Sequence, residues 1–191
     1  MGKGEKINNK YKFNKQNIYM EVIPSFQVDH SNLLPGIYES RLDKDEETGF
    51  VQTTFDIRMT APNQEPAIAP AALHTIEHIV ATYLRNHSEW KKKIIYWGPM
   101  GCLTGNYLIV KGTYKPEVIR DLMIEAMQFV VDFDDVVPGA APDACGNYLM
   151  HDLPMAKWEA ARYITRLKEN FCSEYKQLQR LDINGMQFHD A

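Results

Sequence analysis

Two histidines and a glutamate at helical spacing form the strongest chemical signal in the sequence. His74, Glu77 and His78 lie within residues 71–90, whose apolar and polar spacing is that of an amphipathic helix. At about 100° per residue, His74 and His78 project from one face one turn apart, and Glu77 points to the same side. Two neutral imidazoles can bind one divalent cation, and the carboxylate can move a proton to or from the group that the cation polarises. The alternative is an ordinary, partly exposed helix that binds no metal.

A catalytic metal needs at least one more protein ligand, and Cys145 is the best candidate. It precedes Gly146 in a loop where backbone can approach closely. A thiolate with two imidazoles suits Fe(II), Zn(II) or Co(II) rather than Mg(II) or Ca(II). Three protein ligands would leave a fourth position open for water or substrate. A buried, inert Cys145 is the alternative, because free cysteine is among the most buried residue types.

Cys102 lies between glycines in a loop, unlike a cysteine in an apolar periodic run. A thiol in such a place can be exposed and close to a cation, which would lower its pKa and make it a proton carrier or nucleophile. A small residue that fills a turn is the alternative. Cys172, at the end of a predicted helix, is interpreted as structural.

Arg58 ends a predicted strand and could bind a hydroxyl, carboxylate or ribose group, although arginines there are often simply solvated. Ser25 and His30 lie near the N-terminal predicted strand and could reach a ligand. The remaining histidines have no partner pattern and are interpreted as surface or satisfied residues: His87, His151 and His189.

The elements that must position these residues mix helices with strands of the antiparallel type. A hairpin is predicted from residues 37–42 and 50–59, because a charged, glycine-containing connector joins them. Further strands are predicted at residues 22–30, 94–97 and 106–114, and further helices at 117–133 and 154–171. Without a regular βαβ alternation, this order favours an α+β fold, an antiparallel sheet with helices packed on one face.

Length and composition predict one catalytic domain, residues 21–191, after a polar N-terminal extension, residues 1–20. The chain has 191 residues, 45% hydrophobic content and a net charge of −4. No basic stripe offers a nucleic-acid footprint, and no stretch reads as a signal peptide or a membrane span. We therefore expect a cytoplasmic protein with a small-molecule or protein partner and no membrane or nucleic-acid partner.

Five segments together resemble one family, the S-ribosylhomocysteine lyases or LuxS proteins. The segments occur in the family's order and at about its spacing: residues 25–30, 55–63, 74–87, 98–102 and 145–146. The resemblance implies a LuxS/metallohydrolase-like sandwich and a homodimer with its active site at the interface. It also implies a metal, usually Fe²⁺ with Zn²⁺ or Co²⁺ as substitutes, bound by His74, His78 and Cys145.

The resemblance further implies the reaction and the remaining roles. S-ribosylhomocysteine would be cleaved to homocysteine and 4,5-dihydroxypentane-2,3-dione, the precursor of the quorum-sensing signal autoinducer-2, by carbonyl migration and β-elimination. Glu77 and Cys102 match the family's acid and base. Ser25, His30 and Arg58 match positions that contact substrate.

The sequence departs from the family pattern at two positions beside Cys102. Leu103 stands where the family usually has arginine, and Asn106 where it usually has an aromatic residue. Losing a cation there should raise the pKa of the Cys102 thiol. A homologue that keeps the metal without turnover, or acts on another substrate, is therefore one alternative; an inverzincin-type metallopeptidase, in which Glu77 would activate water, is another.

Overall fold

Four antiparallel strands form the sheet on which the functional residues are arranged. The structure is a computed structural model that describes residues 10–13 and 18–176. The strands are β3 (Gly36–Lys44), β4 (Val51–Arg58), β5 (Ile94–Pro99) and β6 (Gly105–Lys111). They lie in the order β3-β4-β6-β5, and each neighbouring pair is antiparallel. The predicted hairpin of β3 and β4 is therefore confirmed.

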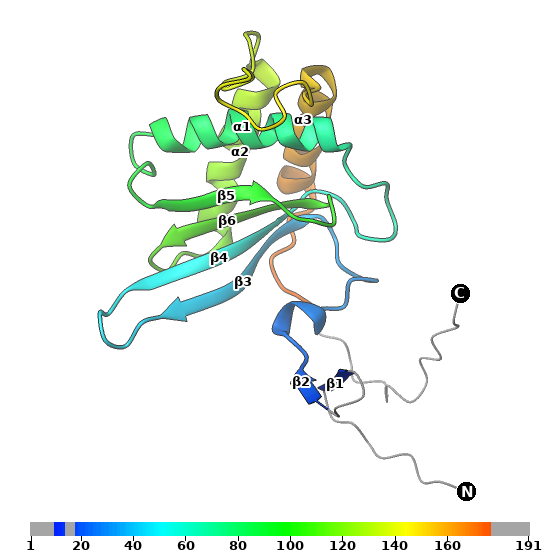
Figure 1. The fold of residues 1–191 in the computed structure, drawn as a ribbon, viewed down its shortest axis with the longest axis vertical. Coiled ribbons are helices and arrows are strands. Elements are labelled where there is room, and N and C mark those ends of the chain that lie inside the picture. The colour runs from blue at the N-terminus through cyan, green and yellow to red at the C-terminus, as the bar shows by residue number, and fades with distance from the viewer. Residues whose placement is uncertain (1–9, 14–17, 177–191) are drawn as a thin grey trace, which may run out of the picture.

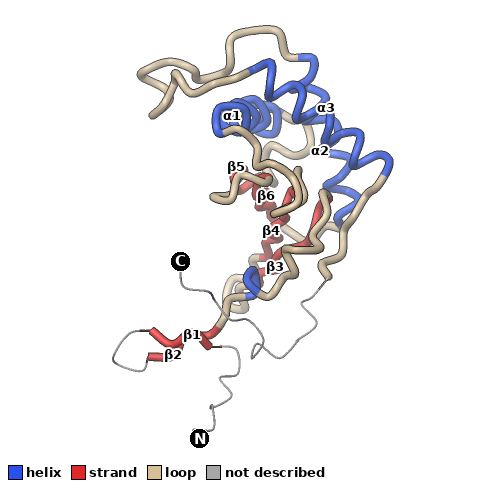
Figure 2. The backbone as a smooth tube through the Cα atoms, turned by 90° about the vertical axis from the view of Figure 1, so that its right-hand side faces the viewer, coloured by secondary structure: helices blue, strands red, loops and turns tan. Residues whose placement is uncertain are grey.

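Three helices cover one face of this sheet (Figures 1 and 2). They are α1 (Pro70–Asn86), α2 (Pro116–Asp132) and α3 (Leu153–Glu169), and each has a proline in its first turn. Proline is favoured there because its missing N–H would have no partner within the helix. This arrangement confirms the predicted α+β fold with helices on one face of an antiparallel sheet.

The hydrophobic core lies between the sheet and the helices. On β4, Phe55 and Ile57 are fully buried in it, so the alternating Asp56 and Arg58 face the other side of the sheet. The helix α1 buries an apolar stripe at the spacing expected of one helical face: Ala72, Leu73, Ile76, Ile79, Val80 and Leu84. Its histidines are therefore left on the opposite stripe.

Two sequence predictions differ from the structure. Residues 22–30 are not a strand: Pro24–Phe26 is a short 3₁₀ helix, in which the Phe26 N–H donates to the Ile23 carbonyl oxygen. Proline has no N–H for a sheet and its fixed φ suits a helical turn. The helix predicted over residues 71–90 ends at Asn86, because His87 adopts an extended conformation.

The N-terminal extension includes regular structure where it is described. Lys10–Phe13 (β1) and Ile18–Glu21 (β2) pair as an antiparallel two-stranded sheet. The division of the chain at residue 20 stays a prediction. Among the described residues, no helix is both long and apolar enough to cross a membrane.

Candidate functional site

The two histidines of α1 face the long loop between α2 and α3, residues 133–152, which we call the α2–α3 loop. His74 and His78 are half-buried, and their ring centroids are 4.6 Å apart. The Nδ1 of His74 lies 2.8 Å from the Met150 carbonyl oxygen, and the Nδ1 of His78 lies 2.7 Å from that of Pro138. A carbonyl oxygen only accepts, so both Nδ1 atoms donate. The lone pair of each neutral ring is then on Nε2, as a metal ligand requires.

A glycine allows the α2–α3 loop to approach His78 closely. Gly139 has a φ of +71°, and a Cβ there would lie 3.4 Å from the Nδ1 of His78. There is room for such a Cβ, but an L-residue would be strained in this backbone conformation. Gly139 therefore helps to hold the neighbouring Pro138 carbonyl against His78.

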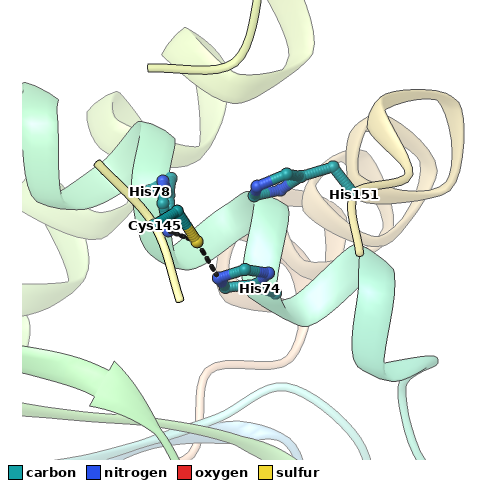
Figure 3. A group of neighbouring side chains, drawn as sticks. All are labelled: His74, His78, Cys145 and His151. Carbon is teal, nitrogen blue, oxygen red and sulfur yellow. Dashed lines mark hydrogen bonds between the residues drawn. The ribbon is translucent and has the colours of Figure 1, made fainter. Parts of the chain in front are cut away.

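Cys145, from the same loop, completes a group of ligand atoms (Figure 3). Its Sγ lies 3.5 Å from the Nε2 of His74 and 3.7 Å from the Nε2 of His78. The Asn147 N–H donates to this sulfur at 3.4 Å. Nitrogen and sulfur donors that converge in this way fit a divalent cation such as Fe(II), Zn(II) or Co(II).

His151 is a fourth member of this group, and the interpretation of it as a surface or satisfied histidine was wrong. Its ligand atom lies within 4.8 Å of those of His74, His78 and Cys145. Its ring stacks on that of His74 at a centroid distance of 4.3 Å. The sequence signal was weak, since His151 has no helical spacing to the other ligands and only its position six residues after Cys145 could have indicated it.

The hydrogen bonds of Thr75 fix the tautomer of His151. The Thr75 hydroxyl donates its only proton to the Ala71 carbonyl oxygen at 2.8 Å and accepts the Asp152 N–H at 2.9 Å. The Nδ1 of His151, 3.2 Å from that hydroxyl oxygen, must therefore be the donor. Its Nε2 is buried and has no hydrogen-bond partner among the described residues. Burial and the neighbouring His74 and His78 lower the pKa of His151, which favours a neutral ring with a free lone pair on Nε2.

Glu77 lies on α1 between the two histidines and is half-buried. Its position follows from the helix alone, because residues three apart share a face. His87, which follows α1, accepts the Glu89 N–H at 3.1 Å, as expected of a satisfied histidine. His189 lies outside the described residues.

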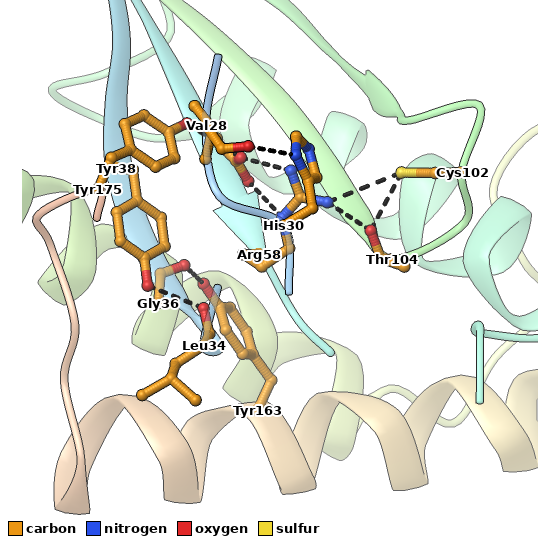
Figure 4. Close-up of polar contacts among 11 residues, drawn as sticks. Val28, His30, Leu34, Gly36, Tyr38, Arg58, Cys102, Thr104, Tyr163 and Tyr175 are labelled. Atoms are coloured by element: carbon orange, nitrogen blue, oxygen red, sulfur yellow. Dashed lines mark hydrogen bonds and ion pairs between the residues drawn. The ribbon is translucent and has the colours of Figure 1, made fainter. Parts of the chain in front are cut away.

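A second group of polar residues gathers at the end of β4, on the sheet face opposite the helices (Figure 4). Asp56 and Arg58 form a buried ion pair, 2% and 3% exposed, with the Arg58 Nε donating to Asp56 Oδ1 at 3.0 Å and Nη2 donating to Oδ2 at 2.5 Å. The remaining nitrogen of Arg58, Nη1, donates to the Thr104 hydroxyl and lies 3.7 Å from the Cys102 sulfur. Burial raises the pKa of the Asp56 carboxyl, and the Arg58 guanidinium opposes that rise.

Arg58 provides a cation beside Cys102, although the neighbouring position 103 holds leucine. Burial alone would raise the pKa of the Cys102 thiol, but the hydrogen bond with Thr104 and the Arg58 guanidinium lower it below its ordinary value. The expectation that leucine in place of arginine at position 103 raises the pKa of this thiol, relative to a chain with arginine there, stays a prediction. The Cys102 sulfur lies 3.0 Å from the Thr104 hydroxyl oxygen, and the residue is exposed.

Ser25, His30 and Arg58 line one pocket of about 230 Å³ on this face of the sheet. The sequence had named all three as candidates for ligand contact, and the structure brings them together. His30 contributes its ring from the segment before β3, and its Nδ1 lies 2.9 Å from the Val28 carbonyl oxygen. The rest of the pocket wall includes a residue that no sequence pattern indicated, Tyr175.

Comparison with known proteins places these features in a family context. A family model described as S-ribosylhomocysteinase (LuxS) matches residues 23–174. A Phocaeicola vulgatus protein named S-ribosylhomocysteine lyase is 61% identical over 155 residues, covering 81% of this chain and 95% of the relative. Proteins of the same name from Porphyromonas gingivalis and Clostridium beijerinckii are 57% and 49% identical, over 76% and 79% of this chain and 90% and 94% of theirs.

Proposed function

The chain belongs to the S-ribosylhomocysteinase (LuxS) family, and we propose that it is an S-ribosylhomocysteine lyase, a metal-dependent enzyme that cleaves a carbon–sulfur bond. The observation that carries the proposal is the convergence of His74, His78 and Cys145 in a chain that matches the family over residues 23–174. The reaction would convert S-ribosylhomocysteine to homocysteine and 4,5-dihydroxypentane-2,3-dione.

The chemistry requires a Lewis acid and groups that move protons. The opened sugar carries an aldehyde, two enolisations move the carbonyl from C1 to C3, and β-elimination then releases the homocysteine thiolate. His74, His78 and Cys145 would hold a divalent cation, which would supply a Lewis acid for the carbonyl oxygen. Fe²⁺ is the proposed native ion, with Zn²⁺ or Co²⁺ as substitutes, because one thiolate and two imidazoles suit these cations.

Cys102 and Glu77 are the proposed proton carriers. Thr104 and Arg58 lower the pKa of the Cys102 thiol below its ordinary value, which favours the thiolate that could remove a proton from carbon and return it at the next position. Glu77 lies on the same face of α1 as the metal-ligand candidates, and its proposed role is to exchange protons with the oxygens of the substrate. Each role rests on the family match and on the position of the side chain.

Ser25, His30 and Arg58 are the proposed substrate contacts, since all three line one pocket. Within residues 10–13 and 18–176, none of the three metal-ligand candidates lines this pocket. A homodimer in which a second copy completes the site would explain this separation. That assembly, a cytoplasmic location and a signalling role for the product stay predictions.

The decisive experiment measures thiol release from S-ribosylhomocysteine by protein purified without oxygen and loaded with Fe(II) or Co(II). We expect release that is lost in Cys102→Ala, with one metal still bound per chain, and retained in Cys172→Ala, the matched control. Cys145→Ser should lose both metal and turnover. No release from the wild-type protein with one metal per chain would refute the lyase and favour a non-catalytic homologue.

A further inference from the structure

The segment that follows α3, residues 171–176, crosses the pocket side of the sheet; we call it the C-terminal strap. We propose that Tyr175 in this strap is a positioning residue for Cys102, acting through Asp56 and Arg58. The proposal rests on the proposed lyase function only in giving Cys102 a chemical role. The contacts that join Tyr175 to Cys102 do not depend on which reaction the protein catalyses (Figure 4).

Backbone hydrogen bonds hold the strap at two points. The Ile37 N–H donates to the Cys172 carbonyl oxygen at 2.9 Å, and the Asp29 N–H donates to that of Lys176 at 3.2 Å. Gly36 permits the first contact, because a Cβ there would lie 2.2 Å from the same Cys172 oxygen. The strap is thus joined both to β3 and to the segment that contributes Ser25 and His30 to the pocket.

The ring of Tyr175 is fixed between these two points. It stacks on Tyr38 with a centroid distance of 4.7 Å and an interplanar angle of 12°. Its hydroxyl donates to Asp56 Oδ2 at 3.0 Å, whereas the Tyr38 hydroxyl donates to the Leu34 carbonyl oxygen at 2.8 Å. Of the two stacked tyrosines, only Tyr175 therefore contacts the buried carboxylate.

The carboxylate of Asp56 transmits this contact to the thiol. Its two oxygens accept from Nε and Nη2 of Arg58, which fixes the plane of the guanidinium and directs Nη1 at Cys102 and Thr104. A bidentate pair of this kind has a fixed geometry. Losing the Tyr175 hydroxyl would leave Oδ2 with one donor fewer and allow the carboxylate, and the guanidinium with it, to rotate.

Two other titratable side chains line the pocket with Asp56 and Arg58, one from β6 and one from the segment before β3. Tyr107 of β6 and His30 face the same pocket as Asp56 and Arg58. None of them changes in a Tyr175 variant, so a change at Cys102 would report the orientation of Arg58. Tyr175 lies one residue beyond the match to the family model, residues 23–174.

Alkylation kinetics at Cys102 test the proposal without turnover. The rate of iodoacetamide reaction at the Cys102 peptide, followed by mass spectrometry across pH in the full chain, gives the midpoint of thiolate formation. Tyr175→Phe keeps the stacked ring and removes the hydroxyl. We expect its midpoint to rise by about half a pH unit, a roughly threefold smaller thiolate fraction below the midpoint. Tyr38→Phe, the matched control, should leave the midpoint unchanged.

An unchanged midpoint in Tyr175→Phe would overturn the proposal. If Tyr175→Leu then changed the midpoint, the ring would act only by packing. In a protein that releases thiol from S-ribosylhomocysteine, Tyr175→Phe should also lower kcat more than it changes KM. Wild-type protein without lyase activity would refute the proposed function and leave the alkylation result valid.

Discussion

The buried ion pair at the end of β4 predicts a large loss of stability when only one partner is removed. Asp56→Asn keeps the size of the side chain and removes its charge. Arg58, only 3% exposed, would remain as a buried cation without a counterion, and the new amide NH₂ would face a guanidinium or hydroxyl donor. The substitution therefore removes a favourable charge and introduces an unfavourable contact at the same time.

The expected loss in the free energy of unfolding is about 3–5 kcal/mol, the usual cost of breaking a buried pair from one side. That is a substantial part of the roughly 5–15 kcal/mol by which domains are stable. Replacing both partners, Asp56→Leu with Arg58→Met, should recover most of the loss, because buried pairs are often no more stabilising than well-packed apolar residues.

Urea unfolding followed by circular dichroism measures this loss, and the chain provides a matched control. Asp43 accepts from Arg41 at 2.8 Å with the same two-residue separation, but their side chains are 39% and 64% exposed. Asp43→Asn should change the midpoint little, since exposed pairs are screened by water and salt. If Asp56→Asn and Asp43→Asn had equal effects with an unchanged m-value, the reasoning from burial would be refuted.

Two further predictions concern the metal group and an ion pair at α3. Thr75→Val removes the oxygen that orients His151, and should weaken metal binding by about tenfold in competition with a chelator. Thr82→Val, on the same helix, is the control and should leave metal binding unchanged. Equal effects of the two substitutions would mean that the orientation of His151 does not affect metal binding. Glu65 accepts from Arg166 at 2.6 Å, and although burial alone would raise the pKa of this carboxyl, Arg166 lowers it below its ordinary value of 4.5. The pair therefore stabilises the fold above that value and ceases to do so as pH falls through the lowered pKa. Glu65→Gln should lose about 1 kcal/mol at neutral pH and nothing in strong acid, and a loss independent of pH in the unfolding curves would contradict the assignment.

The helices were predictable because each buries one face over about five turns. The helix predicted at residues 117–133 is α2, Pro116–Asp132, and that at 154–171 is α3, Leu153–Glu169. The strand order β3-β4-β6-β5 was not predictable in the same way. It depends on pairing between β4 and β6, which are separated by α1 and β5, and no local pattern specifies such a contact.

The candidate site likewise has a part that the sequence predicts and a part that depends on tertiary structure. His74 and His78 share a face because of helix geometry, which the sequence determines locally. His151 lies near them only because the α2–α3 loop packs against α1. The hydrogen bonds of the Thr75 hydroxyl with His151 and Asp152 depend on the same packing. The contact of Tyr175 with Asp56 is likewise set by tertiary packing.

Arg58 approaches Cys102 from β4, independently of the residue at position 103. In the pairing of β4 with β6, Arg58 is opposite Gly105, three residues after the thiol. A Cβ on Gly105 would lie 2.1 Å from the Ile57 carbonyl oxygen, so this glycine allows the close approach that brings the guanidinium to the sulfur. Leu103 has a φ of +58° and packs against the core instead. The cation that lowers the pKa of the Cys102 thiol thus comes from β4 and not from position 103.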